Sequence, residues 1–87
     1  MDLIQIKKNN IVIEYDPEYD MITAYKYRGP NTLDEEVEPG LFLNKDEKSQ
    51  QVYGFTMFDF MIPGKCTKLP FGLDCVSLKS LLKRHIH

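Results

Sequence analysis

The chain has 87 residues, of which 43% are hydrophobic and 28% are charged, and its formal net charge at pH 7 is −2. A chain of this length has no room for two cores, and its composition is too apolar for a disordered protein. We therefore expect one folded domain over residues 1–87. No apolar run approaches the roughly 20 residues that span a bilayer, and residues 1–10 lack the pattern of a secretory signal, so we expect a cytoplasmic protein with no membrane contact.

Turn-forming residues divide the first part of the chain into short β-branched and aromatic runs. The runs Leu3–Lys7 and Ile11–Tyr15 flank Lys8-Asn9-Asn10, and asparagine tolerates the left-handed backbone of a tight hairpin turn. A third run, Met21–Tyr27, follows the turn signal Asp16-Pro17. We predict a β-hairpin followed by a third strand.

The acidic segment Leu33–Glu38 allows two interpretations. Thr32 with Glu35 three residues later matches a helix capping box, but Pro39-Gly40 ends the segment after barely two turns. We therefore predict an extended, exposed edge segment, whose charges discourage pairing with other chains.

The most hydrophobic strand is predicted at Gln51–Phe60, after a short strand at Leu41–Leu43 and a polar hairpin loop over residues 44–50. Alternation places Tyr53, Phe55 and Met57 on one face and Phe58 and Phe60 on the other. Gly54 indicates a bulge or a close approach of a neighbouring backbone.

The strand-like pattern of the sequence ends after Met61, where prolines and glycines indicate an irregular stretch. Asp74 can then cap a short amphipathic helix that runs to His85 and needs a surface to lie on. The predicted fold class is therefore α+β, mainly β. It comprises a small antiparallel β-meander sheet of about five strands over residues 1–60, and one short C-terminal helix within residues 61–87.

Charge is distributed unevenly along the chain. Residues 1–60 contain 12 acidic and 6 basic residues, whereas residues 61–87 contain 5 basic residues and a single acidic one. An acidic body thus carries a basic tail. This asymmetry fits a protein partner, a nucleic-acid contact or a solvated helix face.

Candidate catalytic and metal-binding residues do not form recognisable motifs. Both histidines, His85 and His87, lie at the C-terminal end, where chains fray. Eight residues separate Cys66 and Cys75, unlike the closely paired cysteines of structural zinc sites, and we expect them to be free thiols in a reducing compartment.

The alternating carboxylates of residues 14–20 also lack the glycine and glutamate of a calcium loop, and no glycine pattern matches a nucleotide-binding loop. We predict no catalytic residues, no metal site and no cofactor. The sequence therefore predicts a protein that is not an enzyme.

Several segments resemble one known family in their order along the chain. They are Tyr15-Asp16-Pro17-Glu18-Tyr19-Asp20, the strand Met21–Tyr27, Glu35 to Leu43, Asp46-Glu47 and Val52-Tyr53-Gly54-Phe55. Over about residues 11–60 the chain resembles the small prokaryotic proteins called domain of unknown function 2283. It differs by one extra residue between Lys45 and Gln51, by an added N-terminal strand and by the tail from Met61. The resemblance implies a compact β-meander without assigned catalytic residues, and some members are suspected antitoxins.

The leading hypothesis is a non-enzymatic protein-binding module, antitoxin-like, whose sheet dimerises or supports a partner such as a small toxin. The C-terminal helix would bind the partner through the anchors Leu78, Leu81 and Leu82 and the basic residues Lys79, Lys83 and Arg84. The alternatives are a helix packed on its own sheet, a nucleic-acid-binding regulator using the basic tail, and a small structural subunit of a larger complex.

Overall fold

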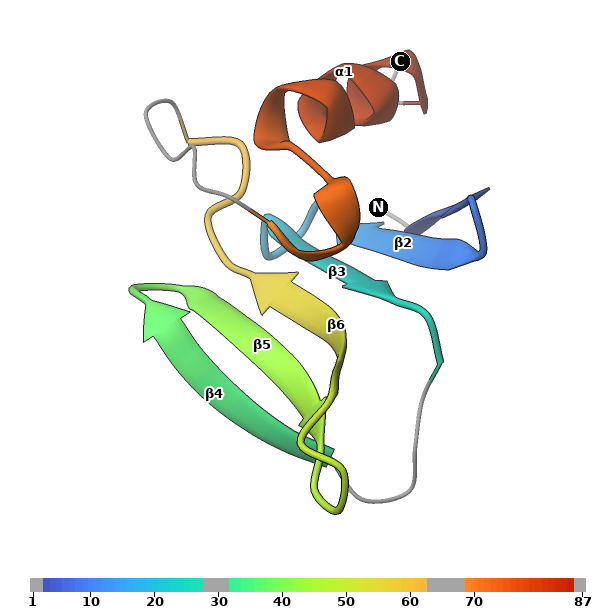
Figure 1. Ribbon diagram of the computed structural model, residues 1–87. Coiled ribbons are helices and arrows are strands. Elements are labelled where there is room, and N and C mark those ends of the chain that lie inside the picture. Colours follow the sequence, from blue (N-terminus) through green and yellow to red (C-terminus); the bar gives the residue numbers. More distant parts are fainter. Residues whose placement is uncertain (1–2, 28–31, 63–68, 86–87) are drawn as a thin grey trace.

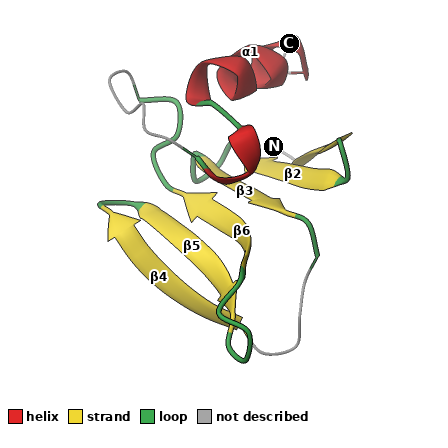
Figure 2. Ribbon diagram, viewed as in Figure 1, coloured by secondary structure: helices red, strands yellow, loops and turns green. Residues whose placement is uncertain are grey.

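A computed structural model describes residues 3–27, 32–62 and 69–85. Its main feature is one six-stranded antiparallel sheet, followed by a C-terminal helix (Figures 1 and 2). The strands are β1 (Ile4–Lys8), β2 (Ile11–Asp16), β3 (Met21–Tyr25), β4 (Thr32–Glu38), β5 (Leu41–Asp46) and β6 (Val52–Met57). A single-turn helix, η1 (Pro70–Gly72), precedes the helix α1 (Cys75–His85). The predicted fold class is confirmed.

The sheet consists of two three-stranded meanders that lie side by side. Its order is β1-β2-β3-β6-β5-β4, so the last strand of each meander pairs with the other and β1 and β4 form the edges. The acidic segment forms the edge strand β4, so the sheet has six strands where about five were predicted. Every residue of β4 is exposed. The prediction of an extended, exposed edge segment is therefore confirmed over the helical alternative.

Local turn chemistry explains the hairpins. Asn9 and Asn10 both have positive φ, 50° and 64°, as the predicted hairpin requires. The loop predicted over residues 44–50 is shorter than expected, because β5 continues to Asp46. Lys45 Nζ binds Glu35 Oε2 on β4 at 2.8 Å, and the Asp46 carboxylate accepts a hydrogen bond from the Lys48 backbone N–H at 2.8 Å.

One face of the sheet carries the hydrophobic core, and α1 lies over the part of that face formed by β2 and β3 (Figure 1). Ile13, Ile22 and Phe55 on three adjacent strands are fully buried together with Leu82 of the helix. Asp74 begins the helix as predicted, because its carboxylate accepts hydrogen bonds from the Ser77 backbone N–H at 2.9 Å and hydroxyl at 2.8 Å.

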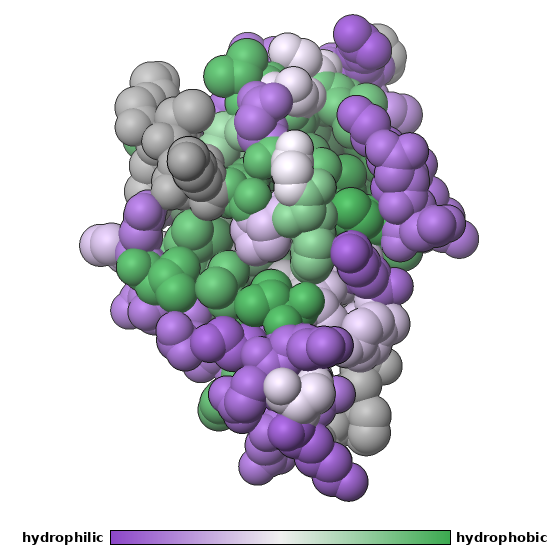
Figure 3. Space-filling view, in the orientation of Figure 1, coloured by the Kyte–Doolittle hydropathy of each residue, from purple (hydrophilic) through white to green (hydrophobic). Residues whose placement is uncertain are grey.

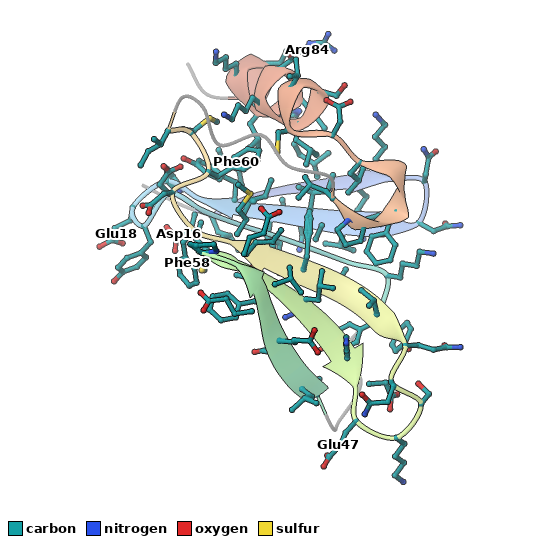
Figure 4. All side chains as sticks on the ribbon, turned by 60° about the vertical axis from the view of Figure 1, so that its left-hand side comes forward. Asp16, Glu18, Glu47, Phe58, Phe60 and Arg84 are labelled. Carbon is teal, nitrogen blue, oxygen red and sulfur yellow. The ribbon has the colours of Figure 1, made fainter. Side chains whose placement is uncertain are left out.

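Phe55 and Met57 share the core face of β6, as predicted. The prediction that Tyr53 lies with them is wrong: Tyr53 is buried, but it lies outside the core cluster and lines a groove together with Thr23 and Thr56. The prediction that Phe60 lies on the opposite face is wrong, because the strand ends at Met57 and Asp59 has a φ of 54°. The chain therefore turns, and Phe60 is fully buried in the core under α1 (Figure 4).

A buried hydrogen bond joins the β2–β3 turn to the end of β6. Tyr15 Oη donates to Asp20 Oδ1 at 2.6 Å, and the same carboxylate accepts from the Met61 backbone N–H at 3.1 Å. The Asp20 carbonyl oxygen accepts from the Phe60 backbone N–H at 3.1 Å. Asp20 thus fixes the chain where it leaves the sheet.

Changing Tyr15→Phe should lower the free energy of unfolding by about 2 kcal/mol at pH 7, because the variant loses a hydrogen bond to a carboxylate. Burial raises the pKa of Tyr15 well above its ordinary value, and the Asp20 carboxylate raises it further. The folded protein therefore holds this proton to a higher pH than the unfolded chain. The resulting stabilisation is present below about pH 10 and is lost as the pH rises further.

Urea unfolding at several pH values, followed by circular dichroism, checks this prediction. Stability of the native sequence should fall above about pH 10 more steeply than that of Tyr15→Phe. Tyr19→Phe is the matched control, because the Tyr19 side chain is 65% exposed. Equal pH slopes for the native protein and Tyr15→Phe would contradict the role given to the buried hydrogen bond.

Candidate functional site on the open face of the sheet

The leucines of the helix predicted to bind a partner are packed in the protein's own hydrophobic core. Leu78 and Leu82 are 3% and 0% exposed, and Leu81 is partly buried against the same core. The assignment of these leucines as partner anchors is therefore corrected, and the alternative that α1 packs on its own sheet describes the structure. A helix this short is stable only when its apolar face is buried, and the nearest apolar surface is the sheet itself.

The three basic residues of the predicted site lie around the helix rather than in its buried stripe. Lys79 Nζ lies 5.6 Å from the centre of the Phe60 ring. Lys83 and Arg84 are exposed, and Figure 4 shows Arg84 on the outer side of α1. Their role in binding stays a prediction.

The opposite face of the sheet, here called the open face, is hollowed into a groove of about 560 Å³. Strand alternation explains its composition: Glu14, Thr23 and Thr56 are one residue away from core positions on β2, β3 and β6, so they point away from α1. The groove is lined by Leu3, Glu14, Met21, Thr23, Tyr25, Thr32, Asp34, Asn44, Tyr53 and Thr56. Every strand from β2 to β6 contributes a lining residue.

Hydrogen bonds between neighbouring strands orient the polar side chains of the groove. On one side, Gln5 Nε2 donates to Glu14 Oε2 at 2.9 Å, and Tyr25 Oη donates to the same oxygen at 3.4 Å. On the other side, Asn44 Nδ2 donates to Asp34 Oδ1 at 2.8 Å. The two carboxylates thus lie on opposite sides of the groove in fixed orientations.

Asn44 is the buried polar side chain of the described part of the chain, with 8% of its surface exposed. Its amide is a neutral donor, so the hydrogen bond to Asp34 leaves the negative charge of that carboxylate in place. Thr23 Oγ1 and Thr56 Oγ1 lie 3.5 Å apart at the centre of the groove. The centre therefore offers hydroxyl groups and the sides offer acceptors with negative charge.

Gly54 pairs with Tyr25 on β3 and with Asn44 on β5, and both of these partners line the groove. A Cβ atom at this position would lie 2.6 Å from the Ala24 carbonyl oxygen and 2.9 Å from Tyr25 Cβ. The predicted close approach of a backbone is confirmed. The register of β5 against β6 also shifts beside it, between Asn44 and Lys45, as the predicted bulge requires.

Aromatic side chains continue the open face toward one end of the sheet. The rings of Phe42 and Phe58 meet edge to face with centres 5.9 Å apart, and Phe58 is 40% exposed. Figure 4 shows Phe58 beside Asp16 and Glu18 at this end, with Glu47 at the far end of the molecule. The open face thus combines an apolar end with an acidic groove.

Charge on the adjoining edge has the same sign. Asp34, Glu35, Glu36 and Glu38 all lie on β4, and hydrophilic side chains gather over the end of the sheet where β4 and β5 lie (purple, lower part of Figure 3). The edge and the groove together present a negative surface to a ligand.

Metal-binding side chains do not converge in the part of the chain that the structure describes: no three of His, Cys, Asp and Glu lie close enough to hold an ion. Of the four residues considered for zinc, Cys66 and His87 lie outside the described residues. Cys75 is a free thiol buried in the core, and His85 is exposed at the end of α1. Among the described residues no helix has the length and apolar character needed to cross a membrane.

The groove was not identified from the sequence, although its parts were visible there. Glu14 belongs to the alternating carboxylates that resemble an incomplete calcium loop. Alternation shows that Glu14, Thr23 and Thr56 avoid the core, but only the pairing of β3 with β6 brings them into one row. Comparison with family models, curated proteins and solved structures gave no match to this chain.

Proposed function

We propose that this chain is a protein-binding module, and that its groove on the open face binds an extended, basic segment of a partner protein. The observation that carries the proposal is the groove itself, with Glu14 and Asp34 oriented on its two sides. Its volume falls in the range of sites that hold compact ligands, about 300–1,000 Å³. A few residues of an extended peptide fit such a space.

Charge complementarity determines the class of partner. Lysine or arginine side chains of the bound segment would meet Glu14 and Asp34, while its backbone and small polar groups would meet Thr23 and Thr56. The exposed Phe58 would contact an apolar residue at one end of the segment. Negative charge on β4 would attract such a segment and speed its association.

A binding role is favoured over a catalytic one by the side chains that line the groove. Among the described residues no histidine, cysteine, lysine or serine lines it. The Thr23 and Thr56 hydroxyls contact each other, Glu14 accepts a hydrogen bond from Tyr25, and Asp34 accepts one from the Asn44 amide.

The partner suggested by the resemblance to domain of unknown function 2283 is a small toxin with a basic surface. Co-expression with the product of a neighbouring gene, with rescue of growth as the measurement, tests that extension. We do not extend the proposal to a homodimer through β4, because antiparallel pairing of two β4 edges would bring like charges together.

A fluorescent peptide of alternating lysine and threonine should bind the native protein, and the double variant Glu14→Gln with Asp34→Asn should bind it about tenfold more weakly. This loss corresponds to about 1.4 kcal/mol for two ion pairs at a partly exposed site. Fluorescence anisotropy at low salt provides the measurement.

Glu47→Gln is the matched control, because Glu47 is an exposed acidic residue that does not line the groove; Figure 4 shows it at the lower end of the molecule. It should leave the affinity within twofold of the native value. Equal affinity of the native protein and the double variant would reject the groove as the binding site. Equal binding of a glutamate-threonine peptide would reject charge complementarity.

A further inference from the structure

A second hollow, of about 470 Å³, lies at the β1–β2 hairpin and shares no lining residue with the groove. Its lining is Lys7, Lys8, Asn9, Asn10, Ile11, Val12 and Lys26. Three of these side chains are basic, two are amides and none is acidic. In a chain with a net charge of −2, this is a local concentration of positive charge. We call it the lysine hollow.

Lys7 and Lys8 are consecutive residues at the end of β1, and Lys26 directly follows β3. Lys8 pairs with Ile11 and Lys7 with Val12 across the hairpin. Val12 pairs with Tyr25 on β3, so Lys26 follows beside Ile11 on the other side. Lys8 and Lys26 are thus two strand spacings apart, about 10 Å along the hydrogen-bonding direction.

Lys26 is held in place by contacts at both of its ends. Its backbone N–H donates to the Tyr53 carbonyl oxygen at 2.8 Å. Its ammonium nitrogen lies 4.8 Å from the centre of the Phe71 ring, a distance that favours a cation–π contact. The cation therefore has a preferred position before any ligand binds.

Carboxylates do not neutralise this cluster. Within the described residues, Lys7, Lys8 and Lys26 form no ion pair, in contrast to Lys45, which pairs with Glu35. Asp74 interacts electrostatically with Lys8, and its carboxylate also caps α1. Hydrogen bonds from Ser77 are the main reason that the pKa of Asp74 lies below its ordinary value, and the charge of Lys8 adds a smaller effect.

We propose that the lysine hollow binds phosphate groups. Lys8 and Lys26 lie on the same face of the sheet, and an anion between their ammonium groups is attracted by both. Phosphate oxygens accept hydrogen bonds from lysine ammonium groups and from the amides of Asn9 and Asn10. The phosphates belong either to a small phosphorylated ligand or to the backbone of single-stranded nucleic acid.

Two probes distinguish these sources: inorganic triphosphate and a short oligothymidylate, each titrated into the whole protein at low salt and followed by calorimetry. Binding of triphosphate alone identifies a small phosphorylated ligand. Tighter binding of the oligonucleotide, weakening steeply with added salt, identifies nucleic acid. Binding of neither probe overturns the proposal.

Substitutions of the lysines test whether the phosphate probes bind at the lysine hollow. Lys8→Gln and Lys26→Gln together should weaken binding of the tighter probe at least tenfold, whereas Lys26→Arg, which keeps the charge, should bind within about threefold of the native protein. Lys48→Gln, on the exposed β5–β6 turn, is the matched control and should bind as the native protein does. An equal loss in Lys48→Gln, or no loss in the double variant, would show that the lysine hollow is not the site.

Discussion

Replacing Leu82 by alanine is expected to lower the free energy of unfolding by about 2–5 kcal/mol, the range for a leucine removed from a fully buried site. Leu82 is 0% exposed and packs among Ile13, Ile22 and Phe55. A domain of this length has roughly 4–13 kcal/mol of stability in total, so the loss would be a large fraction of it. Urea unfolding followed by circular dichroism measures the change.

Val76→Ala is the matched control on the same helix, because Val76 is 65% exposed. It should change stability by less than about 0.5 kcal/mol. If Leu82→Ala were as mild as Val76→Ala, α1 would not be packed on the sheet. The helix would then again be available as the partner-binding arm that its leucine stripe first suggested.

Gly54→Ala should destabilise the protein by about 3 kcal/mol, because the added methyl group would lie 2.6 Å from the Ala24 carbonyl oxygen. That atom is backbone in the neighbouring strand, so relief requires β3 and β6 to separate. These two strands join the halves of the sheet. Urea unfolding again measures the effect, and the variant should also bind the lysine-threonine peptide more weakly because β3 and β6 both contribute residues to the groove.

Gly72→Ala separates crowding from backbone strain. Gly72 has a φ of 70°, but an added Cβ would meet no atom within 4 Å. Its substitution should therefore cost only the strain of the left-handed conformation, about 1 kcal/mol. A Gly54→Ala variant no less stable than Gly72→Ala would show that the contact between β3 and β6 is looser than described.

Local chemistry made much of the fold predictable from the sequence. Asn9 and Asn10 specify the first hairpin through their tolerance of positive φ, and Asp74 specifies the start of the helix through its carboxylate. Pro39-Gly40 indicated that the acidic segment is too short for a stable helix. Each of these signals depends on residues close together in the chain.

Long-range pairing could not be predicted in the same way. Alternation shows which residues share a face, but it does not show which strands are neighbours. The pairing of β3 with β6 joins Thr23 to Thr56, 33 residues apart, and so creates the groove. Phe60 was misplaced for a related reason: the positive φ of Asp59 ends the alternation before that residue.

The leucine stripe of α1 shows that sequence spacing also cannot distinguish a partner-binding helix from one that packs on its own sheet. Leu78, Leu81 and Leu82 have the spacing of a partner-binding helix, and the same spacing suits a helix that packs on its own sheet. Only the presence of a matching apolar face decides between them. Here Ile13, Ile22 and Phe55 provide that face, so the binding surface is proposed elsewhere.

The most direct test of the central claim is to map the bound lysine-threonine peptide by the amide chemical shifts of the isotopically labelled protein. We predict that the signals of Thr23, Asn44, Gly54 and Thr56 on the open face move as peptide is added. Those of Leu78 and Leu82 should stay unchanged, because α1 covers the other face. Shifts confined to α1, with the open face unaffected, would contradict the account.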